Sequence, residues 1–123
     1  MASRVLIVDD AVFMRNTIKE IFSSSGFEIA GEAANGVEAV EKYKDLKPDI
    51  VTMDIVMPFK NGIQATREIL AGDPDAIIII CSALGQESLV TEAIESGATD
   101  FIVKPFRGEN VMQVVKKALA TRR

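Results

Sequence analysis

The sequence predicts an α/β protein in which five βα units wind around a parallel five-stranded sheet, with helices on both faces. Apolar runs of strand length alternate with segments of helical period from one end of the chain to the other. Residues 76–81 form an apolar run without polar alternation, as expected for a central strand that helices cover on both sides. The 123 residues fit one compact domain, residues 1–123, and leave no room for a second domain of ordinary size.

The first two units contain both clear and weak elements. A strand is expected at residues 4–8, followed by a helix at about residues 11–25 that ends at a glycine. The second strand, near residues 27–30, has the weakest pattern, and the helix at residues 36–46 ends where Pro48 disfavours helical backbone in the residue before it. Side chains expected to face the core are Ile18, Ile21 and Phe22 in the first helix and Val37, Val40 and Tyr43 in the second.

Turn signals separate the elements of the last three units. Pro58 and the Asn61-Gly62 pair mark a loop after the third strand, and Pro74 and Gly97 follow the next two helices. The expected strands are residues 49–53, 76–81 and 100–103, and the expected helices are a segment up to residue 72, residues 86–96 and residues 109–121. The carboxyl ends of all five strands then meet at one edge of the sheet.

Composition excludes several classes of function. The formal net charge of −4 argues against nucleic-acid binding, which needs clustered cations, although the Arg122-Arg123 terminus is basic. The chain has no histidine, which excludes Ser-His-Asp catalysis, His-ligated zinc and a phosphohistidine on the chain itself. Any chemistry must therefore use carboxylates, hydroxyls and lysines.

The compartment follows from cysteine use and hydropathy. The single cysteine, Cys81, has no partner within the chain, and no signal-peptide pattern precedes Arg4, so we expect a cytoplasmic protein. The longest apolar run, residues 76–81, is far shorter than the roughly 20 residues that span a bilayer, so no membrane insertion is expected. A monomer is expected, although charge and patterning leave the oligomeric state open.

Polar residues follow four of the five predicted strands. Asp9 and Asp10 come after the first strand, Asp54 after the third, Ser82 after the fourth and Lys104 after the fifth. In an open parallel sheet, ligand sites lie at this carboxyl edge. We therefore expect all five side chains to gather at one place.

Each of these residues also has an ordinary structural interpretation. Asp9 and Asp10 suit the start of a helix, Asp54 and Ser82 suit turns, and Lys104 suits a solvated surface. However, three crowded carboxylates repel one another and have raised pKa values unless a cation neutralises them. Magnesium fits best, because it accepts one or two carboxylates together with waters and phosphate oxygens. A lysine and a hydroxyl would then stabilise a transferring phosphoryl group, for which Asp54 is the natural nucleophile.

Five motifs together carry a family resemblance that covers the whole chain. They are residues 5–10, residues 49–58 followed by Asn61-Gly62, the Ser82-Ala83 pair, residues 97–101 and the Lys104-Pro105 pair. In this order they resemble the receiver domain of bacterial and archaeal two-component response regulators. With Phe13-Met14-Arg15 opening the first helix, the chain is most similar to the stand-alone chemotaxis members. This resemblance implies a flavodoxin-like strand order, 2-1-3-4-5.

The resemblance also implies roles for the residues at the sheet edge. Asp54 would take a phosphoryl group from a phosphohistidine on a separate histidine kinase. Asp10, Asp54 and the main-chain carbonyl of Val56 would hold Mg²⁺, with Asp9 orienting its waters. Lys104 would pair with Asp54 before phosphorylation and with the phosphoryl oxygens afterwards, and its peptide bond to the following proline is expected to be cis.

By the same resemblance, phosphorylation would move Ser82 toward the phosphoryl group and let Phe101 turn inward. The changed face, formed by the fourth helix, the fifth strand and the fifth helix, would bind an output partner, either a flagellar motor switch protein or an adaptor to it. Two positions depart from the family pattern: Val56 and Leu84 stand where polar side chains often help water attack the acyl phosphate. A long-lived phosphorylated form that needs a dedicated phosphatase is therefore predicted.

Two alternative functions stay open. A Mg²⁺-dependent phosphatase would use an aspartyl phosphate, but such enzymes usually place a second acid where this chain has Val56. We therefore expect no enzyme activity beyond self-catalysed phosphoryl transfer to Asp54 and slow autodephosphorylation. The other alternative is a phosphorelay carrier or a single-domain regulator of a different output, and only the partner distinguishes it from a motility switch.

Overall fold

The computed structural model describes residues 3–121, so the basic pair at residues 122 and 123 lies outside it. The strands are β1 (Arg4–Val8), β2 (Glu28–Ala33), β3 (Ile50–Asp54), β4 (Ile78–Ser82) and β5 (Asp100–Val103). The helices are α1 (Val12–Ser24), α2 (Gly36–Leu46), α3 (Gly62–Gly72), α4 (Glu87–Glu95) and α5 (Gly108–Ala120). All strand pairs are parallel, in the order β2-β1-β3-β4-β5, which confirms the predicted fold class.

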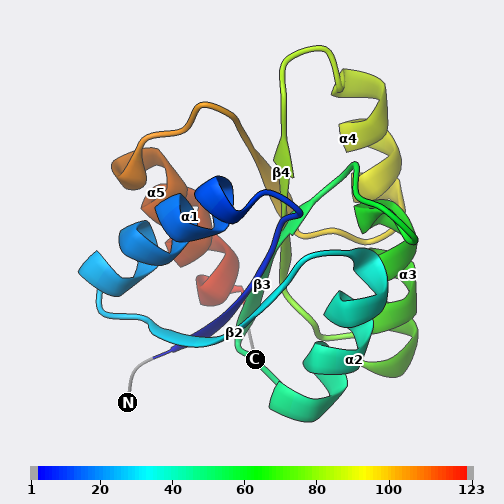
Figure 1. The fold of residues 1–123 in the computed structure, drawn as a ribbon, viewed down its shortest axis with the longest axis horizontal. Coiled ribbons are helices and arrows are strands. Elements are labelled where there is room, and N and C mark those ends of the chain that lie inside the picture. Colours follow the sequence, from blue (N-terminus) through cyan, green and yellow to red (C-terminus); the bar gives the residue numbers. More distant parts are fainter. Residues whose placement is uncertain (1–2, 122–123) are drawn as a thin grey trace.

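Helices cover the sheet in two layers, with α1 and α5 on one face and α2, α3 and α4 on the other (Figure 1). Side chains of β1 alternate between the layers: Val5 and Ile7 pack toward α1 and α5, and Leu6 and Val8 pack toward the other three helices. Strands β3 and β4 are buried along their whole length. The unbroken isoleucines of β4 thus reflect burial on both faces, as predicted.

The second unit differs most from the prediction. Strand β2 extends to Ala33 and, as an edge strand, is only partly buried, which explains its weak apolar pattern. The prediction that Val37 faces the core is wrong, because 40% of this residue is exposed. The buried face of α2 instead follows Gly36, Ala39, Val40 and Tyr43, at helical spacing, and Val37 lies one position off that stripe.

The ends of the central strands bear directly on function. Strand β3 runs to Asp54 and β4 runs to Ser82, so both candidates are the last residues of buried strands and not loop residues. Their backbones are therefore held by the sheet. Within residues 3–121, every helix is too short or too polar to span a bilayer.

Candidate functional site

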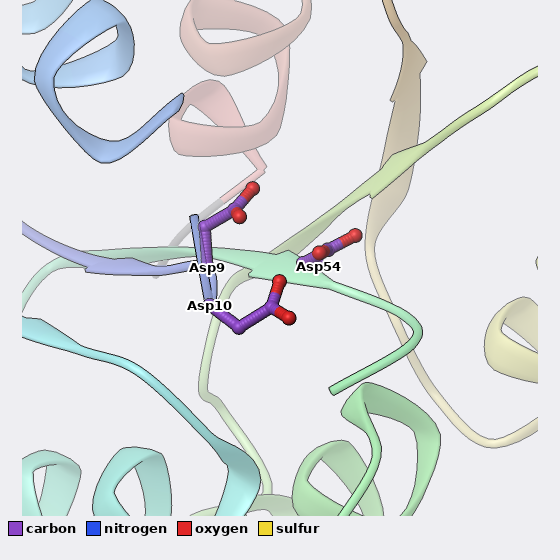
Figure 2. Close-up of side chains that lie close together, drawn as sticks. All are labelled: Asp9, Asp10 and Asp54. Atoms are coloured by element: carbon purple, nitrogen blue, oxygen red, sulfur yellow. The ribbon is translucent and has the colours of Figure 1, made fainter. Parts of the chain in front are cut away.

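Three carboxylates meet at the carboxyl edge of the sheet (Figure 2). Each of Asp9, Asp10 and Asp54 offers an oxygen, and these oxygens all lie within 4.8 Å of one another. Asp9 and Asp10 follow the last residue of β1, and Asp54 ends the neighbouring strand β3. Asp9 and Asp54 are buried, whereas Asp10 is exposed, so the cluster opens to solvent on one side.

Lys104 reaches this cluster from the end of β5. Its Nζ lies 3.2 Å from Asp9 Oδ2 and 3.3 Å from Asp54 Oδ1, so one ammonium group contacts both buried carboxylates. Its backbone N–H donates to the carbonyl of Ser82 over 2.7 Å, which ties its main chain to the end of β4. The Lys104-Pro105 peptide bond is cis.

Burial and charge shift the ionisation of this group. Burial, followed by the negative charge of Asp9, raises the pKa of Asp54 from 3.8 to about 6, although Lys104 and a hydrogen bond from the Ile55 N–H act in the opposite direction. Burial alone would lower the pKa of Lys104, but the attraction of Asp54 and then Asp9 outweighs it and raises that pKa. At neutral pH the lysine is therefore charged and Asp54 is mostly ionised.

The ordinary role of Asp9 is present beside its place in the cluster. Its Oδ1 accepts a hydrogen bond from the backbone N–H of Ala11 over 2.9 Å, which shapes the turn into α1. Asp54 Oδ1 likewise accepts from the N–H of Ile55 over 2.9 Å. These bonds fix the direction of both carboxylates without using all of their oxygens. The structural and functional interpretations of Asp9 are thus compatible.

Ser82 ends β4 and Phe101 lies within β5, and among residues 3–121 no hydrogen bond joins either side chain to the carboxylates. Ser82 is buried, and its hydroxyl donates to the Ile102 carbonyl over a long 3.3 Å. Phe101 exposes 40% of its surface, so its ring is not packed into the core. The hydroxyl thus makes a weak bond within the sheet, and the aromatic ring lies outside it.

Large hydrophobic side chains are exposed on the segments that follow the carboxyl ends of the strands. Val56 in the loop after β3 and Leu84 in the loop after β4 are 59% and 81% exposed. Val12, Phe13 and Phe59 are exposed on neighbouring segments of the same edge. The side chains of Val56 and Leu84 are thus exposed and offer no polar group to a water molecule.

Close backbone contacts hold the loop between β3 and α3. The N–H of Gly62 donates to the carbonyl of Ile55 over 2.7 Å, and a Cβ atom at Gly62 would lie 2.0 Å from the carbonyl oxygen of Asp54. A side chain at this position would therefore displace the strand end that carries Asp54. Asn61 adds a capping box with Gln64 at the start of α3. The Asn61-Gly62 pair predicted a turn, but nothing in the sequence indicated this close approach.

Sequence reasoning also missed Arg15 and Glu32. Arg15 Nη1 donates to the carbonyl of Asp9 over 2.6 Å, and its Nε bonds Glu32 Oε1 over 3.1 Å. Lys19 Nζ lies 2.9 Å from the other oxygen of Glu32. The hydrogen bond from Lys19 and, more weakly, that from Arg15 lower the pKa of Glu32 against the opposing effect of burial. Glu32 thus anchors the arginine that holds the backbone of Asp9.

The donor set suits a hard divalent cation. All three side chains offer oxygens, and the crowding that raises the Asp54 pKa would be relieved by a bound positive charge. The exposure of Asp10 leaves room for the waters that magnesium usually keeps. The acidic cluster is therefore compatible with Mg²⁺ binding.

Comparison with protein families identifies the group to which the chain is related. Residues 5–116 match the family described as the response regulator receiver domain. The chain belongs to this family. Chemotaxis protein CheY of Thermotoga maritima is 62% identical over 117 residues, which cover 95% of this chain and 98% of that protein. Chemotaxis protein CheY of Bacillus subtilis is 56% identical over 119 residues, covering 97% and 99% of the two chains.

Solved receiver structures have the same fold. A chain in the crystal structure of the CheX-CheY-BeF3-Mg complex from Borrelia burgdorferi superposes with a TM-score of 0.89 and 46% identity, covering 94% of this chain and 87% of that one. The response regulator domain of Thermotoga maritima CheB gives a TM-score of 0.90 and 38% identity, covering 98% of each chain. The family assignment made from the sequence motifs is confirmed, including its similarity to chemotaxis members.

Proposed function

We propose that this receiver domain is a phosphorylation-activated signalling switch in which Asp54 accepts the phosphoryl group of a phosphohistidine on a separate histidine kinase. The observation that carries the proposal is the convergence of Asp9, Asp10 and Asp54 with the Lys104 ammonium on one strand edge. The absence of histidine from the sequence supports a donor on another protein.

The transfer is a single displacement at phosphorus. A carboxylate oxygen of Asp54 attacks, an O–P bond forms, and the N–P bond to the donor imidazole breaks with the electron pair leaving on nitrogen. Asp54 must be ionised for this step, and with a pKa of about 6 it is mostly ionised at neutral pH. Lys104, already 3.3 Å from Asp54, balances negative charge on the phosphoryl oxygens.

Magnesium completes the site in this proposal. Asp10, Asp54 and the main-chain carbonyl of Val56 would hold the ion, and Asp9 would orient its waters. Bound Mg²⁺ supplies charge neutralisation for the phosphoryl group. The CheY of the Borrelia burgdorferi structure was crystallised with Mg²⁺, which supports this choice of metal.

Switching would follow from Ser82 and Phe101. The long hydrogen bond from the Ser82 hydroxyl to Ile102 is readily exchanged for a bond to a phosphoryl oxygen, and Phe101 then turns into the space that is vacated. The surface of α4, β5 and α5 changes as a result. We propose that this surface binds a flagellar motor switch protein or an adaptor to it, because the curated relatives are chemotaxis proteins.

The environment of the protein fits this function. Cys81 is buried and forms no disulfide, and burial raises the pKa of its thiol to about 12, so it is inert. We therefore propose that the switch works in the reducing cytoplasm, as a monomer with no membrane insertion and no nucleic-acid partner.

Intact-mass spectrometry after incubation with acetyl phosphate and Mg²⁺ tests the central claim. The wild type should gain the mass of one phosphoryl group, and Asp54→Asn should gain none. An unmodified wild type would contradict the phosphoacceptor role. Continuous release of phosphate from small phosphate esters would instead favour the magnesium-dependent phosphatase.

The lifetime of the phosphorylated form tests the roles of Val56 and Leu84. We expect slow autodephosphorylation, because both side chains are apolar and exposed where a polar group would orient the attacking water. Val56→Asn should release phosphate faster than the wild type, and Val56→Ala serves as the control for shortening the side chain. Equal rates for Asn and Val at this position would contradict the prediction, along with the need for a dedicated phosphatase.

A further inference from the structure

The sequence contains two Asn-Gly pairs, and each pair opens a helix on the same face of the sheet. Asn35 caps α2 and Asn61 caps α3, each accepting a hydrogen bond over 2.9 Å from a backbone N–H in the first turn of its helix. The glycine that follows each cap is the first residue of the helix. The first N–H groups of a helix have no acceptor within it, so those of Gly36 and Gly62 need acceptors elsewhere.

Both glycine amides donate to the loop between β3 and α3. The N–H of Gly62 bonds the Ile55 carbonyl over 2.7 Å, and the N–H of Gly36 bonds the Lys60 carbonyl over 2.9 Å. The second bond comes from another helix, α2, which lies beside α3 (Figure 1). The loop is therefore held near both of its ends. Val56, whose main-chain carbonyl is a proposed Mg²⁺ ligand, lies between the two held carbonyls.

The contact at Gly36 leaves no room for a side chain. A Cβ atom at this position would lie 2.3 Å from the carbonyl oxygen of Lys60 and 2.8 Å from its carbonyl carbon. These are backbone atoms, so they cannot rotate away as the end of a side chain can. The Lys60 ammonium also pairs with Glu68 of α3. The end of the loop is thus fixed by a backbone contact to α2 and by an ion pair to α3.

The loop needs this support because it contains a strained turn. Phe59 has a φ of 68°, in a region that bulky residues rarely adopt, and the N–H of Lys60 donates to the Pro58 carbonyl over 2.8 Å. Together these features describe a γ-turn of the rarer, positive-φ kind. Phe59 is 88% exposed, so packing of its ring does not hold the turn. Backbone strain persists only where neighbouring structure maintains it, and Gly36 bonds the last residue of this turn.

We infer that the Asn35-Gly36 pair is a positioning motif for the Mg²⁺ site, in which the Gly36 N–H holds the Lys60 carbonyl and thereby keeps the β3–α3 loop in the geometry that binds the ion. This inference rests on the proposed function, because it takes Val56 as a ligand of the metal. Among residues 3–121, no hydrogen bond joins Asn35 or Gly36 to the three carboxylates, so the pair acts through the loop. Its effect should appear in metal binding, before any phosphoryl transfer.

Calorimetric titration of the full chain with Mg²⁺ alone tests the inference. Gly36→Ala should weaken Mg²⁺ binding about tenfold, as expected when a contact that supports a metal site is lost. Gly72→Ala is the matched control, because it makes the same change in a helix where a Cβ atom would meet nothing within 4 Å. This control should leave the affinity unchanged.

A second pair of variants tests the motif without forcing an atom against the loop. Asn35→Ala removes the cap of α2 and should weaken Mg²⁺ binding about two- to threefold, because the first turn that carries Gly36 loosens. Tyr43→Phe removes the hydrogen bond from the Tyr43 hydroxyl to Asp73 at the other end of α2. Both variants should unfold at lower urea concentration than the wild type, but Tyr43→Phe should keep its Mg²⁺ affinity.

A double-mutant cycle separates positioning from a general weakening of α2. Glycine adopts a positive φ without strain, so a loop with Phe59→Gly should depend less on the Gly36 contact. In that background Gly36→Ala should weaken Mg²⁺ binding only about threefold, instead of about tenfold. A substitution that merely destabilised α2 would reduce the affinity by the same factor in both backgrounds.

Several outcomes would overturn the inference. These are wild-type Mg²⁺ affinity in Gly36→Ala, equal weakening by Gly72→Ala, equal affinities of Asn35→Ala and Tyr43→Phe, equal factors in the two Phe59 backgrounds, or a wild type that binds no Mg²⁺. A wild type that binds Mg²⁺ but gains no phosphoryl group from acetyl phosphate, with Gly36→Ala still binding more weakly, would support the positioning role while contradicting the phosphoacceptor role. The two failures are therefore distinguishable.

Discussion

The acidic cluster and the α4–β5 groove, which is lined mainly by apolar side chains such as those of Leu84, Ile94 and Phe101, depart in opposite ways from what folding alone would select. At the cluster, two carboxylates are buried beside each other, with one lysine to balance them. At the groove, large hydrocarbon side chains are left in contact with water. The first region buries two charged groups, and the second exposes apolar side chains to solvent.

The energetic consequences of the two regions are unequal. A buried charge loses its hydration on folding, and the raised pKa of Asp54 records that loss. An exposed hydrophobic side chain is already in water in the unfolded chain, so leaving it exposed changes the stability little. Substitutions at the cluster should therefore change the free energy of unfolding strongly, and substitutions in the groove should change it little.

The largest effect is expected from Lys104→Met. Removing the ammonium group that contacts both Asp9 and Asp54 leaves two buried carboxylates uncompensated, which should lower the free energy of unfolding by about 3 kcal/mol without Mg²⁺. Urea unfolding followed by far-UV circular dichroism measures this change. Saturating Mg²⁺ should restore part of the loss, and a variant as stable as the wild type in metal-free buffer would contradict the assigned charge balance.

Asp54→Asn should act in the opposite direction. The pKa of Asp54 is raised to about 6, so its protonated form stabilises the fold below the unfolded-state pKa of 3.8, and that stability is lost as the pH rises through about 6. The free energy of unfolding of the variant should therefore exceed that of the wild type by roughly 1–3 kcal/mol at pH 8, and the two values should be equal at pH 4. A gain that does not depend on pH would show that charge is not its cause.

Arg15→Gln should have a smaller effect on stability and a specific effect on metal binding. Losing the bond to the Asp9 carbonyl should cost about 1 kcal/mol and weaken Mg²⁺ binding severalfold, because that backbone carries two of the carboxylates. Lys19→Gln is the matched control, since it removes an ion pair with Glu32 and does not touch Asp9. Calorimetric titration with Mg²⁺ should separate them. If Arg15→Gln and Lys19→Gln weakened Mg²⁺ binding equally, the positioning role of Arg15 would be contradicted.

The smallest effect on stability is expected in the groove. Ile94→Thr should change the free energy of unfolding by less than about 0.5 kcal/mol, because Ile94 is already 39% exposed. Ile79→Thr in the buried strand β4 makes the same chemical change and should cost more than about 2 kcal/mol. Similar losses at both positions would mean that the groove is part of the core.

Much of the fold was predictable because its signals are local. Each signal can be recognised within a few residues, as with the apolar run that ends at Cys81, the helix end at Gly97 and the turns at glycine and proline. The strands and helices of the structure lie close to where these signals predict them. The errors lie where local signals are weak. Strand β2 is an edge strand with little apolar pattern. In α2 the small residue Ala39 lies on the buried face, whereas the larger Val37 does not.

The site was predictable in its residues and much less so in its contacts. The meeting of Asp9, Asp10 and Asp54 with Lys104 was predictable because the carboxyl ends of parallel strands share an edge, a rule that needs only the strand positions. The chemical roles of these residues and of Ser82 stay predictions. The roles of Arg15 and Glu32 and the close approach of Gly62 to Asp54 were not found. They depend on how a helix, an edge strand and a loop pack together, and no spacing along the chain encodes that packing.

The sequence by itself determined the family, the alternation of strands and helices, and the set of polar residues at strand ends. Only the tertiary structure decided that one ammonium group serves two carboxylates, with Lys104 lying 95 residues from Asp9 and 50 from Asp54 along the chain. The same is true of the groove, where Glu87 and Glu95 face open space and Glu92 meets an arginine. Local periodicity fixes which residues form an element, whereas charge pairing and exposure depend on which elements become neighbours.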